Sequence, residues 1–228
     1  MTGSDLLTRR LELVRPLLGP GVALAGADPL ADPPPPFAEE AAGLSPRAVE
    51  KRRNEFAAGR AAAHRAMRAL GRSPAPVLVG EDRAPVWPKG LAGSISHTRS
   101  CAMAVLAEAG TVQGLGLDVE EDLPLKNDLL PAICSAREQA WLRRQAEPGR
   151  MAKLIFSAKE AAYKCQYALS CAYYGFDGME LEIDPAASAY RAIFTAPRPP
   201  FAQGEAIDGR FVIGEGLIVA TADLRGRR

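Results

Sequence analysis

Two acidic residues stand out because one apolar residue separates them within an apolar run. The run, GLGLDVEEDL, extends from Gly114 to Leu123 and carries Asp118 and Glu120. It predicts a β-strand, in which residues two apart share one face. Two adjacent carboxylates repel each other unless positive charge lies between them, and Mg²⁺ prefers such oxygen ligands. The run therefore predicts a metal site. The alternative is an acidic surface turn, since Glu121 and Asp122 follow directly.

A second charged group lies in FSAKEAAYKCQY, which predicts a helix. Glu160 and Lys164 are four residues apart and share a helix face. Glu160 could add a third carboxylate to the acidic pair, and Lys159 and Lys164 could meet the phosphates of a metal-bound substrate. A surface salt bridge between Glu160 and Lys164 is the alternative.

The first half of the chain offers further candidates for binding phosphate. The stretch GSISHTRSCAMAV places His97 in a Gly/Ser turn between two expected strands, where it would reach a phosphate or serve a structural role. An expected helix carries six basic residues, and arginine binds phosphate through two parallel hydrogen bonds. They are Lys51, Arg52, Arg53, Arg60, Arg65 and Arg68. The alternatives are a solvated helix or a weak nucleic-acid patch, and His64 on this helix is expected to be structural.

The elements that must position these residues are long helices and short strands. Ser45 and Pro46 predict the start of a helix that runs to Leu70 and ends at Gly71. Two further helices are expected over 135–144 and 149–170. Strands are expected over 19–27, in VLV, CAMAVLA and TVQGLGLDVE, and in an antiparallel meander of MELEI, YRAIF, GRFVIG and LIVATADL. This mixed order predicts an α+β fold with antiparallel sheets and not a doubly wound parallel sheet.

Composition excludes several classes of protein. The chain has 228 residues and a formal net charge of +1, which gives no global electrostatic case for binding nucleic acid or an anionic membrane. We see neither a signal-peptide core nor a run of about 20 apolar residues that could span a bilayer. The four cysteines form no C-x-x-C pair. A structural zinc site is therefore not expected, and reduced thiols in a cytoplasm fit best.

Four stretches together resemble a known family. In chain order they are RRNEFAAGR, APVWPKGLAGSISHT, GLGLDVE and FSAKEAAYK, which span about Arg52 to Lys164. They resemble the 4′-phosphopantetheinyl transferases, in the larger monomeric class of the enterobactin-synthetase-component type. GLGLDVE is close to the family signature G-[IV]-D-x-E, with Leu117 in place of the β-branched residue. FSAKEAAYK is close to the signature [FW]-S-x-K-E-A-x-x-K.

The resemblance implies a fold and a reaction. The fold is a pseudo-dimer of two similar lobes, each a small antiparallel sheet on a long helix, with the active site in the cleft between them. Residues 1–110 would form the lobe that contacts the nucleotide and phosphates of coenzyme A (CoA), and 111–228 the lobe with the metal site and catalytic helix. The reaction transfers the 4′-phosphopantetheine arm of CoA to a serine of an apo carrier protein and releases adenosine 3′,5′-bisphosphate.

The resemblance also implies roles for individual residues. Asp118, Glu120 and Glu160 would hold Mg²⁺, with Mn²⁺ an alternative in vitro. Glu160, or a water that it orients, would act as base, and Lys164 would stabilise or protonate the leaving phosphate. The implied CoA contacts are Arg52, Arg60, Arg83, Ser96, His97, Lys159 and Lys164. The match at Arg83 is looser, and Arg53 is an alternative to Arg52.

The implied partners are acyl, peptidyl or aryl carrier proteins of nonribosomal peptide, polyketide, siderophore or fatty-acid synthesis. Residues 123–141 would help to dock the carrier, and a cytoplasmic monomer is expected. A non-catalytic CoA-binding protein is the main alternative. A magnesium-dependent nucleotide hydrolase of another fold lacks a Walker-type motif. A nucleic-acid binder is disfavoured by the near-zero net charge and few aromatic residues.

Overall fold

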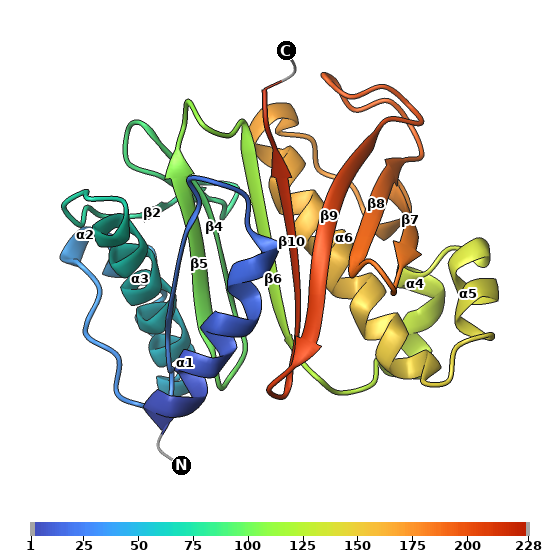
Figure 1. The fold of residues 1–228 in the computed structure, drawn as a ribbon. Helices are drawn as coiled ribbons and strands as arrows, with labels where there is room; N and C mark the ends of the chain where they lie inside the picture. Colours follow the sequence, from blue (N-terminus) through green and yellow to red (C-terminus); the bar gives the residue numbers. More distant parts are fainter. Residues whose placement is uncertain (1–2, 227–228) are drawn as a thin grey trace. The chain divides into compact units, whose positions relative to one another are not determined.

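The computed structural model describes residues 3–226 and combines helices with antiparallel sheets (Figure 1). This confirms the predicted α+β class. Contacts within the chain define two compact units, one up to Val112 and the other from Gln113 to Arg225.

The first unit contains short and long helices around a three-stranded sheet of order β1-β5-β4. Its elements are α1 (Gly3–Val14), η1 (Arg15–Leu17), β1 (Ala23–Ala27), α2 (Ala38–Ala41), α3 (Glu50–Ala69), β2 (Leu78–Val79), β3 (Pro85–Val86), β4 (Leu91–His97) and β5 (Ala102–Glu108). Strands β2 and β3 form a separate two-stranded ribbon.

Helix α3 packs on one face of the three-stranded sheet through a stripe of small side chains. Ala58, Ala62 and Ala66 are fully buried, and alanine lets a helix lie close to a sheet. The opposite face of β1 meets α1, because a side chain at Gly26 would touch the side chains of Leu7 and Leu11. The sequence analysis did not anticipate α1.

Two local expectations for this unit were wrong. Helix α3 begins at Glu50 and not at Pro46, because Ser45 accepts a hydrogen bond from the Arg47 amide in a turn and Val49 remains extended. His97 is the last residue of β4 and does not lie in a turn between strands. The Gly/Ser-rich stretch forms a strand because β5 pairs with it along its whole length, from Leu91 to His97.

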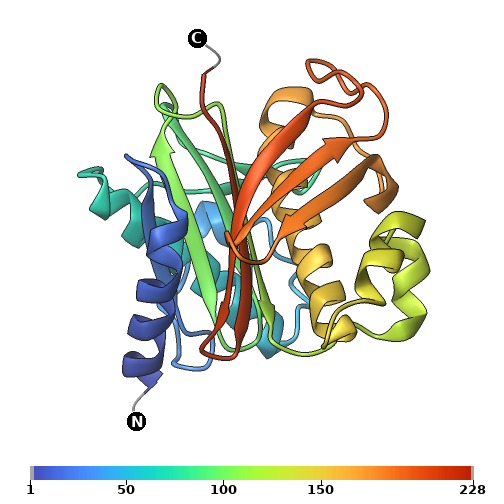
Figure 2. The ribbon, with the colours of Figure 1, turned by 45° about the vertical axis from the view of Figure 1, so that its right-hand side comes forward.

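The second unit is a five-stranded antiparallel sheet of order β6-β10-β9-β8-β7 with a long helix on one face (Figures 1 and 2). Its elements are β6 (Gly114–Glu121), η2 (Asn127–Leu129), α4 (Leu130–Ile133), α5 (Ala136–Leu142), α6 (Pro148–Ser170), η3 (Phe176–Gly178), β7 (Met179–Asp184), β8 (Ala189–Phe194), β9 (Ala206–Gly214) and β10 (Leu217–Leu224). The predicted meander is confirmed as β7 to β10.

One apolar core fills the space between α6 and the five-stranded sheet. Leu154, Ala158 and Ala162 of the helix belong to this core together with Ile218 and Ala220 of β10. Because β10 pairs with β6, this core also determines how far α6 lies from the strand that carries the acidic pair. Among the described residues, no helix is both long enough and apolar enough to cross a membrane.

Candidate functional site

Two glycines determine how closely helix α6 approaches strand β6. A Cβ atom at Gly116 would lie 1.8 Å from the carbonyl oxygen of Ala161, and one at Gly114 would lie 2.2 Å from that of Cys165. Any larger residue would therefore displace the helix. Gly114, Gly116, Asp118 and Glu120 alternate along β6 and share the face that meets α6.

This close approach brings charged side chains of α6 to the acidic pair. The Lys164 ammonium donates to Asp118 Oδ1 at 2.6 Å and to the Leu117 carbonyl at 3.1 Å. The Lys153 ammonium donates to Glu120 Oε2 at 3.1 Å. Asp118 and Glu120 share one strand face, as their spacing predicted, and the structure adds Lys164 beside them. Sequence analysis did not include Lys153.

Glu160 shares its electrostatic environment with both acidic residues of β6. Burial raises the pKa of Glu160, Lys164 opposes this rise, and the charges of Asp118 and Glu120 add to it. Burial and the charge of Asp118 likewise raise the pKa of Glu120, while Lys153 acts to lower it. The three carboxylates therefore repel one another in a partly buried site, which favours a cation among them.

The donor set fits a hard divalent cation. Across residues 3–226, no three histidine, cysteine, aspartate or glutamate side chains are arranged to hold a metal ion as they stand. Two carboxylates on one strand and a third on the facing helix nevertheless provide the all-oxygen ligands that Mg²⁺ prefers. In this arrangement Lys164 and Lys153 supply the compensating charge to Asp118 and Glu120.

An aromatic pocket of about 300 Å³ opens beside Glu160. Its other lining residues are Lys159, Tyr163, Tyr173, Tyr174, Gly175, Phe176 and Met179. The Tyr174 hydroxyl is buried and has no hydrogen-bond partner within the part of the chain that the structure describes. Arg198 lies over the Tyr174 ring, 5.2 Å from its centroid. The pocket suits a flexible chain with apolar stretches and an acceptor for the hydroxyl.

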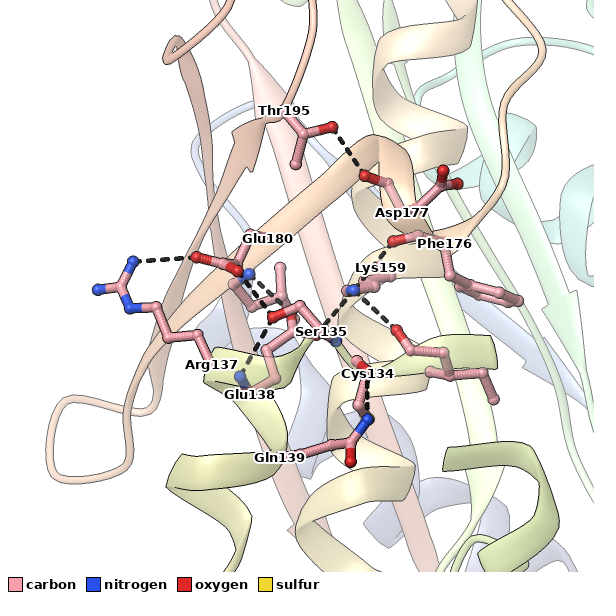
Figure 3. Close-up of polar contacts among 12 residues, drawn as sticks. Cys134, Ser135, Arg137, Glu138, Gln139, Lys159, Phe176, Asp177, Glu180 and Thr195 are labelled. Carbon is pink, nitrogen blue, oxygen red and sulfur yellow. Dashed lines mark hydrogen bonds and ion pairs between the residues drawn. The ribbon is translucent and has the colours of Figure 1, made fainter. Parts of the chain in front are cut away.

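Lys159 was expected to contact phosphate, but its ammonium group is already bonded within the protein. Its ammonium is buried and donates to Glu138 Oε2 at 2.9 Å and to the carbonyls of Ile133 and Phe176 at 2.8 and 2.9 Å (Figure 3). An ammonium has three protons, so none remains for a phosphate. Glu138 in turn accepts the backbone amides of Ser135 and Leu181. Lys159 therefore links α6 directly to α4, α5 and η3, and Glu138 extends this link to β7.

A larger cavity, of about 640 Å³, lies in the first unit. One face of helix α3 lines the cavity through Arg52, Phe56 and Arg60. These residues share a face because they are four residues apart. The other lining residues are Gly43, Leu44, Ser45, Ala48, Val49, Glu55, Gly59, Val79, Arg83, Pro85, Ile95 and His97. The structure thus brings Arg52, Arg60, Arg83 and His97 together.

The arginines of this cavity differ in how they are held. Arg52 Nη1 lies 3.1 Å from His97 Nε2. Arg60 is buried against the Phe56 ring, and no residue in the described range 3–226 accepts a hydrogen bond from its Nε. Arg53 instead donates to the Pro46 carbonyl, which favours Arg52 as the residue that faces the cavity.

The other two predicted CoA contacts in this unit, Arg83 and Ser96, differ in whether they line the cavity. Arg83 lines the cavity from an exposed turn, where its backbone adopts the left-handed conformation with φ of 66°. Ser96 is buried and does not line the cavity, because side chains alternate along β4 and those of Ile95 and His97 face it.

Comparison with known proteins identifies the family. The model of the 4′-phosphopantetheinyl transferase N-terminal domain matches residues 39–107, and that of the 4′-phosphopantetheinyl transferase superfamily matches residues 114–222. The 4′-phosphopantetheinyl transferase Svp of Streptomyces mobaraensis is 38% identical over 188 residues, which cover 80% of this chain and 76% of the relative. The chain belongs to the 4′-phosphopantetheinyl transferase superfamily.

Other relatives agree with this assignment. The 4′-phosphopantetheinyl transferase PptT of Mycobacterium tuberculosis is 33% identical over 208 residues, 86% of this chain and 90% of the relative. Enterobactin synthase component D of Salmonella typhi is 40% identical over 120 residues, 51% of this chain and 49% of the relative. The resemblance inferred from four short stretches is confirmed, and the chain is a transferase.

Two charged residues near the candidate sites of this transferase, Lys153 and Glu40, were not expected from the sequence. Lys153 lies seven residues before Glu160 on α6, a spacing of two helical turns that could have shown their common face. Glu40 lies in a short helix after a proline-rich loop, where nothing local distinguishes it from the exposed Glu39. Only the tertiary structure shows that Glu40 is fully buried.

Proposed function

We propose that this transferase moves the 4′-phosphopantetheine arm of CoA to a serine hydroxyl of an apo carrier protein and releases adenosine 3′,5′-bisphosphate. The observation that carries the proposal is the group of Asp118, Glu120, Glu160 and Lys164, held together by the approach of α6 to β6. Family membership supports the group that is transferred.

Asp118, Glu120 and Glu160 would hold Mg²⁺ or a similar divalent ion. When bound, the ion would neutralise charge on the CoA pyrophosphate. A protein that only bound CoA would gain nothing from three mutually repelling carboxylates, because basic residues alone suffice for phosphate. This argument favours an enzyme over the non-catalytic alternative.

Glu160 is the proposed general base. The serine oxygen forms a bond to the phosphorus that carries the pantetheine arm, and the bond from that phosphorus to the bridging oxygen of the pyrophosphate breaks. The serine proton passes to Glu160, whose pKa burial raises toward the working range of a base. The Lys164 ammonium would stabilise or protonate the leaving phosphate.

The remaining parts of CoA fit the two cavities. We assign Arg52, Arg60 and His97 to phosphate contacts, because all three line the same basic cavity. The aromatic pocket beside Glu160 would take the pantetheine arm. Lys159 lines the aromatic pocket, but its ammonium is already bonded within the fold, and Ser96 lines neither cavity, so we assign neither residue to a phosphate.

The proposed partner is a carrier protein or carrier domain of secondary metabolism. One relative is named enterobactin synthase component D, which supports a siderophore or a related peptide or polyketide pathway. Residues 123–141 would contribute to docking, since Leu123 and Leu129 are 58% and 42% exposed. A cytoplasmic monomer remains our expectation.

The decisive experiment is the intact mass of an apo carrier protein after incubation with this transferase, CoA and Mg²⁺. We expect a phosphopantetheine adduct on the carrier serine, which EDTA prevents and excess Mg²⁺ restores. CoA binding without an adduct on any of several carriers would instead support the non-catalytic alternative.

The metal and base assignments are tested by Asp118→Ala and Glu160→Ala in the same assay. Glu160→Ala should lower the transfer rate by about 10²- to 10⁴-fold, the range expected when a catalytic acid or base is removed. Asp118→Ala should also lower the rate, because it removes a proposed ligand of the metal. Far-ultraviolet circular dichroism should show that both variants fold. Near-normal turnover in either variant would overturn the assignments, and Glu121→Ala serves as the acidic control.

A further inference from the structure

Glu40 is fully buried in the first unit and binds groups from three separate segments. Its Oε1 lies 2.8 Å from His64 Nε2 of α3 and accepts the Val77 backbone amide at 2.8 Å. Its Oε2 accepts the Phe37 backbone amide at 2.9 Å. Arg60 Nε lies 4.0 Å from Oε1. Burying a carboxylate costs free energy unless the charge is paired. Glu40 therefore provides interactions that an apolar residue at this position could not provide.

The segments that Glu40 joins are the walls of the basic cavity. Residues 43–49 follow α2 and form one wall, α3 forms another, and Val79 of β2 lies two residues after Val77 in a third. Glu40 does not line the cavity itself. Its hydrogen bonds connect the three walls to one another outside the cavity.

The charge of Glu40 also acts directly on Arg60. Burial lowers the pKa of Arg60, Glu40 opposes this change, and the nearby Arg52 adds to it. Although burial acts to raise the pKa of Glu40, hydrogen bonds from His64, Val77 and Phe37 hold it below its usual value. Glu40 is therefore an anion at neutral pH, next to an arginine whose Nε has no acceptor within residues 3–226.

We propose that Glu40 is a positioning residue for phosphate binding: its buried carboxylate orients and electrostatically supports Arg60 at the cavity wall. The separation of 4.0 Å between Arg60 Nε and Glu40 Oε1 keeps the two groups paired without a direct hydrogen bond, so Glu40 attracts the guanidinium without engaging its donors. The stacking of Arg60 on Phe56, 4.4 Å from the ring centroid, limits its other movements. This inference rests on the proposed function for the identity of the ligand, CoA.

The test is calorimetric binding of CoA in the presence of Mg²⁺, combined with transfer kinetics. Glu40→Gln removes the charge but keeps the size of the side chain. We expect the dissociation constant for CoA to rise about tenfold, which corresponds to about 1.4 kcal/mol. The value of kcat at saturating CoA should stay within about twofold, because Glu40 does not touch the reacting atoms. A general loss of folding would not produce this split.

Coupling to Arg60 is measured by a double-mutant cycle. Arg60→Gln should weaken CoA binding, and adding Glu40→Gln should cause little further loss, because Glu40 acts through Arg60. Glu39→Gln, next to Glu40 but exposed, is the matched control and should bind CoA like the wild type. If Glu40→Gln does not fold, Glu40→Asp carries the test, because it keeps the charge and shortens the side chain by one methylene.

Three outcomes would be decisive. Wild-type affinity in Glu40→Gln, or full additivity with Arg60→Gln, overturns the positioning role while leaving the proposed function intact. CoA binding without transfer by the wild type overturns the proposed function, and the cycle still decides the role of Glu40. A wild-type protein that does not bind CoA overturns both.

Discussion

Lys159 and Lys164 lie five residues apart on helix α6, yet they have different surroundings. Lys164 is partly exposed and bonded to Asp118, whereas Lys159 is buried between Glu138 and two backbone carbonyls. An advance of five residues turns a helix by about 500°, so the two side chains point to different sides. A charged residue in a motif is therefore available to a ligand only on the side of the helix that faces the site.

The four cysteines differ in the same way, and their reactivity tests the burial that the structure gives. Burial raises the pKa values of the Cys101 and Cys134 thiols to about 11 and also raises that of Cys165. Cys171 is exposed. We expect iodoacetamide at pH 8 to label Cys171 alone in the native protein, because the thiolate is the reactive form.

Peptide mass mapping after labelling provides the measurement, and a sample labelled in denaturant provides the control. In denaturant all four thiols should react. Rapid native labelling of Cys134 would contradict the packing of α4 and α5 described above.

At the scale of elements, the site depends on the distance between α6 and β6. Gly116→Ala would place a Cβ atom 1.8 Å from the Ala161 carbonyl oxygen, so the helix must shift. We expect a loss of about 1–3 kcal/mol or more in the free energy of unfolding, as for other overpacked sites. The transfer rate should also fall, because the shift separates Lys164 and Glu160 from the acidic pair.

Urea denaturation of Gly116→Ala and of the control Gly110→Ala would measure this cost. A Cβ atom at Gly110 would meet no atom within 4 Å, and the control should match the wild type within about 0.5 kcal/mol. Equal stability of the two variants would show that α6 does not lie as close to β6 as described.

The attachment of α5 to α6 depends on the buried pair of Lys159 and Glu138. Lys159→Met leaves the Glu138 carboxylate buried without its ion-pair partner, which typically costs about 3–5 kcal/mol. Arg191→Met breaks only exposed pairs with Glu182 and Asp208 and should cost less than about 1 kcal/mol. If Lys159→Met instead unfolds like the wild type and loses only affinity for CoA, Lys159 binds phosphate after all.

At the scale of the whole molecule, the two units carry their own cores and complementary chemistry. The first presents basic residues around a cavity, and the second presents carboxylates, a lysine and an aromatic pocket. Neither set suffices for the proposed transfer, which requires both a phosphate-binding site and a base. The proposed CoA contacts therefore include residues from each unit, and the contribution of each set can be measured separately.

Ligand-induced stabilisation tests these contacts. With Mg²⁺ and CoA at about 100 times its dissociation constant, the free energy of unfolding should rise by about 2.7 kcal/mol. Arg60→Gln and Asp118→Ala, one from each unit, should each reduce this gain at the same CoA concentration. Full stabilisation of either variant would show that CoA uses the residues of one unit only. Calorimetry should give one CoA per chain.

The sequence by itself determined the family, the α+β class and the meander, and it supplied the candidate residues for the proposed chemistry. Apolar periodicity is local, and the spacing within GLGLDVE and FSAKEAAYK specifies which residues share a face before any tertiary contact forms. These two motifs marked Asp118 and Lys164 as candidate site residues, and the structure adds the hydrogen bond between them.

Only the tertiary structure decided which charged groups are available to a ligand and which hold the fold together. Arg52 rather than Arg53 lines the cavity. The Lys159 ammonium is bonded within the protein, and Glu40 is fully buried next to the cavity wall. These outcomes depend on partners far away in the sequence, such as Val77 for Glu40. Burial and long-range pairing determine the availability of a charge, and neither property is encoded in the local pattern of residues.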